Sequence, residues 1–152
     1  MALAERELKV VTLNTSAYEV SAKTSDKRSE NITADEDMHI VALEHFIGVS
    51  GRGYYSDNGH ILSKNPDNPW VKWAAPSPSG MEPTGTKGYF GYCGRDYYSE
   101  VSGISDILFY ESFPSGHYFL VRKGEKLYMH CYAGNFTEKT VGFHHAVRVI
   151  YW

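Results

Sequence analysis

Histidine is the residue type in this sequence with the greatest potential for site chemistry, because seven histidines occur among 152 residues. An imidazole metal site requires several of these side chains to converge on one point. His39 and His45 are separated by an even number of residues, so we expect them to share one face of a strand, but about 20 Å apart. His144 and His145 are adjacent and are expected to point to opposite faces.

A metal site would therefore need His117 or His130 to meet another histidine across strands, with a carboxylate nearby. The chain has no C-x-x-C or H-x-x-x-H spacing typical of zinc ligands. From the sequence we predict no metal site and no cofactor. Packed or surface histidines are the alternative that this pattern favours.

Catalytic motifs are also missing from the sequence. No G-x-S-x-G elbow occurs, and the glycines around Lys87 lack the spacing of a phosphate-binding loop. Carboxylates for glycoside chemistry exist between residues 96 and 111, but sequence alone does not bring any two of them together. We therefore predict no catalytic residue and a protein that is not an enzyme.

Aromatic side chains offer a different chemistry, since Tyr, Phe and Trp make up 14% of the chain. Many lie between residues 50 and 100 beside amide and charged groups, where flat rings can stack on sugars or fill a protein interface. The alternative is that about half of them fill the core. The ligand or interface candidates are Tyr54, Tyr55, Trp70, Trp73, Tyr97, Tyr98 and Arg95.

The elements expected to position these residues are strands. No stretch carries apolar positions at helical spacing, whereas short runs rich in Val, Ile, Leu, Phe and Tyr recur between turn residues. This pattern predicts an all-β, two-sheet antiparallel sandwich of the jelly-roll kind, with about eight strands. The predicted strands are Leu8–Leu13, Ala17–Lys23, His39–Val49, Gly59–Ser63, Trp70–Trp73, Ile104–Tyr110, His117–Val121, Lys126–Ala133 and Phe143–Trp152.

Two regional patterns refine this expectation. His117–Ala133 alternates in both arms around Lys123-Gly124 and predicts a hairpin. The region from about residue 50 to residue 100 is rich in Gly, Pro, Asn and Ser and predicts long loops. Cys131 lies in an alternating run and is predicted to be a small buried hydrophobe, with a Cys93–Cys131 disulfide as the alternative.

Length and charge limit the class of protein. We expect residues 1–152 to form one domain, because domains cluster around 100–150 residues. The net charge is −3 and Lys and Arg are not concentrated anywhere, so no nucleic-acid partner is expected. No signal peptide or membrane-spanning segment is recognised.

Two stretches resemble the single jelly-roll structural proteins of icosahedral bacterial and archaeal viruses. One is residues 31–40, an acidic turn that leads into a long strand. The other is residues 121–128, with Gly124-Glu125 before a strand, followed by Gly134-Asn135-Phe136-Thr137 and a closing aromatic strand. The resemblance implies a capsid or capsid-associated subunit that packs with copies of itself or other structural subunits and is located in the virion.

Two other functions stay open at this point. A carbohydrate-binding module or lectin would use the aromatic candidates as stacking platforms for glycans. An enzyme with a histidine-centred metal site, as in cupin-like barrels, is the third hypothesis, because seven histidines occur on a β scaffold. Fold alone does not decide among these functions.

Overall fold

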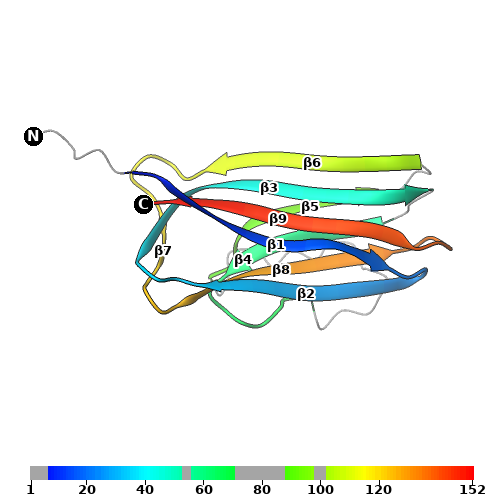
Figure 1. Cartoon of the computed structure of the whole chain (residues 1–152), viewed down its shortest axis with the longest axis horizontal. Helices are drawn as coiled ribbons and strands as arrows, with labels where there is room; N and C mark the ends of the chain where they lie inside the picture. The colour runs from blue at the N-terminus through cyan, green and yellow to red at the C-terminus, as the bar shows by residue number, and fades with distance from the viewer. Residues whose placement is uncertain (1–6, 53–55, 71–87, 98–101) are drawn as a thin grey trace, which may run out of the picture.

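The computed structural model describes residues 7–52, 56–70, 88–97 and 102–152, and in these ranges the chain is all-β with no α-helix. Figure 1 shows long strands that run along the longest axis of the molecule. The strands are β1 (Lys9–Val20), β2 (Thr24–Thr33), β3 (Met38–Arg52), β4 (Ser56–Ser63), β5 (Phe90–Tyr97), β6 (Ser102–Ser112), β7 (Phe119–Val121), β8 (Lys126–Asn135) and β9 (Val141–Tyr151).

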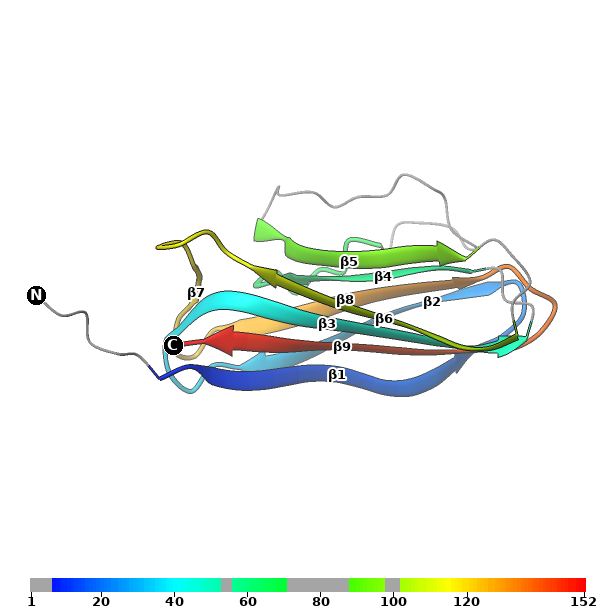
Figure 2. The ribbon, with the colours of Figure 1, turned by 90° about the horizontal axis from the view of Figure 1, so that it is seen from above.

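These strands form two antiparallel sheets that pack as a sandwich (Figure 2). Sheet A has the order β1-β9-β3-β6, with short β7 paired to one end of β3, and sheet B has the order β2-β8-β4-β5. The pairs β4·β5, β3·β6, β2·β8 and β1·β9 are nested in the sequence, each enclosing the one before. A nested ribbon of four antiparallel pairs rolled into two sheets is a jelly roll, so the predicted fold class is confirmed.

The core lies between the sheets and follows the period-two pattern of the central strands. On β9 every second residue from Val141 to Val149 is buried, as the alternation in the sequence predicted. Sheet B contributes β8, which is buried along nearly its whole length. Apolar side chains fill the larger part of this interior, namely Leu13, Met38, Ile40, Leu43, Leu62, Val121, Leu127, Met129, Cys131, Val147 and Val149.

Two strands were missed in the sequence. β2 is almost wholly polar and lies at the edge of sheet B, where its side chains need not be buried. β5 falls in the segment predicted to be loops from its content of Gly, Pro, Asn and Ser, and the strand itself contains Gly91 and Gly94. In addition, the two predicted strands before residue 24 are one strand, β1, which carries an irregularity between Asn14 and Ala17.

The predicted hairpin over His117–Ala133 is wrong. β7 pairs with β3 in sheet A, whereas β8 pairs with β2 and β4 in sheet B. The tight turn exists, since the Glu125 amide donates to the Arg122 carbonyl at 2.9 Å and Gly124 has a φ of 89°. The turn carries the chain from one sheet to the other, so the two alternating arms face each other across the core and are not neighbours in one sheet.

The expectation that His39 and His45 share a face is also wrong. The pairing of β3 with β9 shifts register between Ile40 and Ala42, which places one extra residue in β3. An extra residue reverses the parity of the side chains that follow it. His39 therefore stacks on Trp152 with ring centroids 3.7 Å apart, while His45 is buried between the sheets.

Both cysteines of the chain, Cys93 and Cys131, are buried and free, so no disulfide joins them. In the part of the chain described by the structure, no helix has the length and apolar character needed to cross a bilayer.

Candidate functional site

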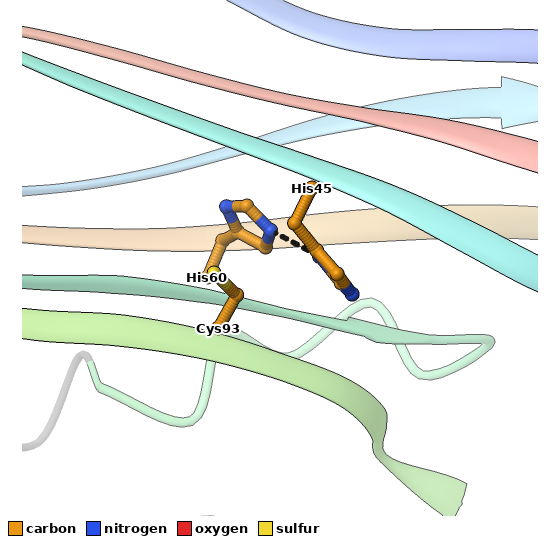
Figure 3. Close-up of side chains that lie close together, drawn as sticks. All are labelled: His45, His60 and Cys93. Carbon is orange, nitrogen blue, oxygen red and sulfur yellow. Dashed lines mark hydrogen bonds between the residues drawn. The ribbon is translucent and has the colours of Figure 1, made fainter. Parts of the chain in front are cut away.

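Three potential metal-ligating side chains meet between the two sheets. His45 comes from β3 of sheet A, while His60 and Cys93 come from β4 and β5 of sheet B (Figure 3). One ligand atom from each, an imidazole nitrogen or the Cys93 sulfur, lies within 4.8 Å of the others. All three residues are buried.

The sheet registers explain why these side chains converge. His60 and Cys93 are direct partners in the β4·β5 ladder, so their side chains point to the same face. His45 is paired with Val147 of β9, a fully buried residue, and so it points into the sandwich from the opposite sheet. Polar side chains therefore fill the space between the sheets around His45 and His60, whereas apolar side chains fill the larger part of the core.

A chain of hydrogen bonds passes through the cluster from the partly exposed Glu111 to the buried His145. Glu111 Oε1 lies 2.7 Å from His45 Nε2, and His45 Nδ1 lies 2.8 Å from His60 Nε2. His60 Nδ1 then lies 3.3 Å from His145 Nδ1. His145 lies on β9, next to His60 in the interior, and its Nε2 has no hydrogen-bond partner.

Glu111 determines which ring nitrogen of each histidine in this chain carries the proton. A carboxylate accepts, so His45 donates from Nε2 and presents Nδ1 as an acceptor to His60. His60 then donates from Nε2 and accepts at Nδ1 from His145. All three imidazoles can be neutral in this order, and the lone pair left over is on His145 Nε2, which is buried.

Burial keeps the histidines neutral. It lowers the pKa of His60 well below its ordinary value, helped by the two neighbouring histidines, and it lowers the pKa of His145 to about 3. Burial also lowers the pKa of His45, although the hydrogen bond to Glu111 opposes this effect. The pKa of the Cys93 thiol is raised to about 11 by burial, with a smaller contribution from the charge of Glu111. Uncharged imidazoles are the form that binds cations.

The cluster lies close to one side of the sandwich, where the edge strands β5 and β6 face each other. Two residues of β6 lie between His45 and solvent there. The Phe109 ring stacks on His45 with centroids 5.8 Å apart and is 49% exposed, and the Glu111 side chain is 37% exposed. These two side chains thus cover His45, whose own side chain is fully buried, on the side nearest to solvent.

The aromatic and charged candidates from the sequence do not gather at this site. Trp70 is buried and packs with Ile61 and Tyr132, so its indole contributes to the core and is not a surface platform. The backbones of Arg95 and Tyr97 pair with Asn58 and Ser56 in sheet B. Tyr54, Tyr55, Trp73 and Tyr98 lie outside the described residues.

The sequence interpretation missed this cluster for a physical reason. Ligand spacing within one strand is the only pattern that a sequence displays directly, but these ligands come from three strands in two sheets. His60 lies in a predicted strand, but Cys93 lies in the segment predicted to be loops, so no pattern in the sequence indicated that the two pair. His144 and His145 do point to opposite faces as predicted, with only His145 in the interior.

No known protein family matches this sequence, and no curated protein matches it significantly.

Proposed function

We propose that this protein is a non-enzymatic structural subunit that assembles with copies of itself through the open edge of sheet A. The observation that carries the proposal is the apolar surface of β6, the edge strand beside β3. Leu108 is 80% exposed and Tyr110 is 60% exposed, both on the outer face of sheet A, and Phe109 is half exposed beside them. An exposed apolar edge strand is a template for pairing with another chain.

The edge of sheet B provides the contrast that makes β6 informative. β2 carries Asp26, Lys27, Arg28 and Glu30, the kind of charged edge that discourages pairing between chains. The side chains of β6 are described for residues 107–112, and among these Glu111 alone is charged. Its carboxylate accepts a hydrogen bond from His45. β2 is thus protected by charge, whereas residues 107–112 of β6 carry a single charged side chain.

A second copy of the chain is the occupant that fits best. The other edge of sheet A, β1, also carries exposed apolar residues at its start: Val10 in the strand and Leu8 just before it. Sheet A of one copy can therefore be continued by sheet A of another, and closed symmetric arrangements are the usual result. Jelly-roll topology and the sequence resemblance support a particle such as a viral capsid, or a subunit that decorates one.

Native mass by light scattering across a concentration series tests the proposal. We expect a concentration-dependent oligomer, and electron microscopy of the concentrated protein should show closed particles if the subunit forms a shell. Leu108→Lys should weaken association at least about fivefold, because a desolvated interface residue contributes more than about 1 kcal/mol.

The matched control is Asn31→Lys, which adds the same charge to an exposed position on the edge strand β2. This variant should assemble like the wild type. A wild-type protein that stays monomeric at high concentration, or a Leu108→Lys variant with unchanged mass, would contradict the proposal.

A further inference from the structure

We infer that His45, His60 and Cys93 bind one Zn²⁺ ion between the two sheets, with Cys93 as the thiolate ligand. The three side chains offer two imidazole nitrogens and one sulfur within 4.8 Å of one another. Imidazole and thiolate are the ligands that zinc prefers in proteins. This inference does not rest on assembly, since all three ligands come from one chain.

The second nitrogen of each histidine supports the assignment. In zinc sites a ligand imidazole usually binds a carboxylate or another acceptor through its other ring nitrogen, which fixes the ring. His45 offers Nδ1 to the cluster and hydrogen-bonds Glu111 through Nε2 at 2.7 Å. His60 offers Nε2 to the cluster, while its Nδ1 lies 3.3 Å from His145. Each ring is thus fixed by a hydrogen bond on the nitrogen that faces away from the cluster.

The distance between the two imidazole nitrogens requires only a small adjustment, and the Cys93 sulfur, which lies within 4.8 Å of them, must lie about 3.5 Å from each in a tetrahedral site. The two nitrogens that face the cluster lie 2.8 Å apart and share one proton. Two imidazoles on a tetrahedral zinc have their nitrogens about 3.3 Å apart, given zinc–nitrogen bonds of about 2.0–2.1 Å. The rings must separate by about half an ångström, and His60 must carry its proton on Nδ1, where His145 accepts it.

Three protein ligands leave one position of a tetrahedral zinc for a solvent molecule, as in zinc sites that are not closed by a fourth side chain. The open side of the sandwich beside Phe109 and Glu111 is where solvent and the ion approach.

The test is a titration of untagged, reduced, metal-stripped full-length protein with Co²⁺, followed by Zn²⁺. We expect one equivalent of Co²⁺ to bind with a sulfur-to-cobalt charge-transfer band in the near ultraviolet, and Zn²⁺ to displace it. Competition with a chromophoric chelator gives the Zn²⁺ affinity. Glu111→Gln should keep the band and lower the affinity by about 10- to 100-fold.

Matched cysteine variants locate the site. Cys93→Ala should lose the charge-transfer band, whereas Cys131→Ala, which changes the other buried free cysteine, should keep it. Circular dichroism verifies that both variants are folded, and Cys93→Ser serves in place of an unfolded Cys93→Ala. Wild-type protein that binds no Zn²⁺, a Cys93 variant that keeps the band, or binding of Cu²⁺ alone would overturn the inference.

Discussion

The surroundings of two buried histidines, His130 and His60, differ in the hydrogen-bond partners that they provide for the imidazole. His130 lies on β8 beneath the segment that follows β4, and both of its ring nitrogens have fixed partners. Its Nε2 donates to the Asn65 carbonyl at 2.8 Å, and its Nδ1 accepts from the Ser29 hydroxyl at 2.7 Å. Tyr128 stacks on the ring with an interplanar angle of 5°. One tautomer satisfies every polar atom.

The cluster around His60 is different, because its imidazoles are partnered mainly by other imidazoles. Only Glu111, at one end of the chain, is a fixed acceptor, so the proton positions of His60 and His145 depend on the ring before them, and the chain ends at the unpartnered His145 Nε2. A buried polar group without a partner destabilises the fold.

The difference shows that this fold satisfies a buried histidine fully where the histidine is structural. In the cluster the hydrogen bonding of the histidines is incomplete, but two nitrogens and a sulfur point to one place. A cation held by His45 Nδ1 and His60 Nε2 would replace the single proton that these two nitrogens share, which would explain why two imidazoles face each other here in place of a carbonyl or hydroxyl partner.

The largest expected difference comes from replacing one histidine in each environment by leucine. His130→Leu should lower the unfolding free energy by about 2–3 kcal/mol, because the Asn65 carbonyl and Ser29 hydroxyl lose their partner. His145→Leu should cost less than about 1 kcal/mol in metal-free protein, because it removes the unpartnered Nε2 and takes the donor from His60 Nδ1, so the number of unsatisfied buried nitrogens does not rise. Urea unfolding of both variants measures the two values, and equal losses would remove the distinction between the environments.

The contrast also shows what the sequence could and could not predict. Alternation along β9 and β8 predicted which of their residues face the core, because a strand packed on a core shows a period of two. The jelly-roll class followed from many such runs. β2 could not be found in this way, since an edge strand with exposed side chains has no apolar pattern to detect.

The candidate site depended on facts that periodicity does not contain. The extra residue in β3 moved His45 to the interior and left His39 outside. The His45–His60 contact joins opposite sheets, so it follows from how the sheets are stacked and not from any spacing in the chain. The aromatic-rich segment attracted functional interpretation, yet its Trp70 is a core residue.

A smaller effect is expected from acid. Burial lowers the pKa of His130, so below the ordinary histidine pKa of 6.5 the unfolded chain binds a proton that the folded chain does not. Stability must therefore fall as the pH falls through 6.5, by at most about 2 kcal/mol for one histidine between pH 6.5 and pH 5. His130→Gln should reduce this loss. Urea unfolding at pH 7 and pH 5 measures it, and a variant with the wild-type pH dependence would show that His130 takes no part.

The smallest equilibrium effect is expected at Phe109, which covers His45 at the open side of the sandwich. Because its ring is half exposed and is not a ligand, Phe109→Ala should change the Zn²⁺ affinity by less than about threefold while Zn²⁺ binds and dissociates faster, as expected when a gating side chain is removed. Stopped-flow measurement with a chromophoric chelator gives both rates. Tyr128→Ala is the control, since that ring stacks on His130 and should leave both rates unchanged. Unaltered rates in Phe109→Ala would mean that the ion reaches His45 by a different path, and the opening between β5 and β6 would then have no role in metal binding.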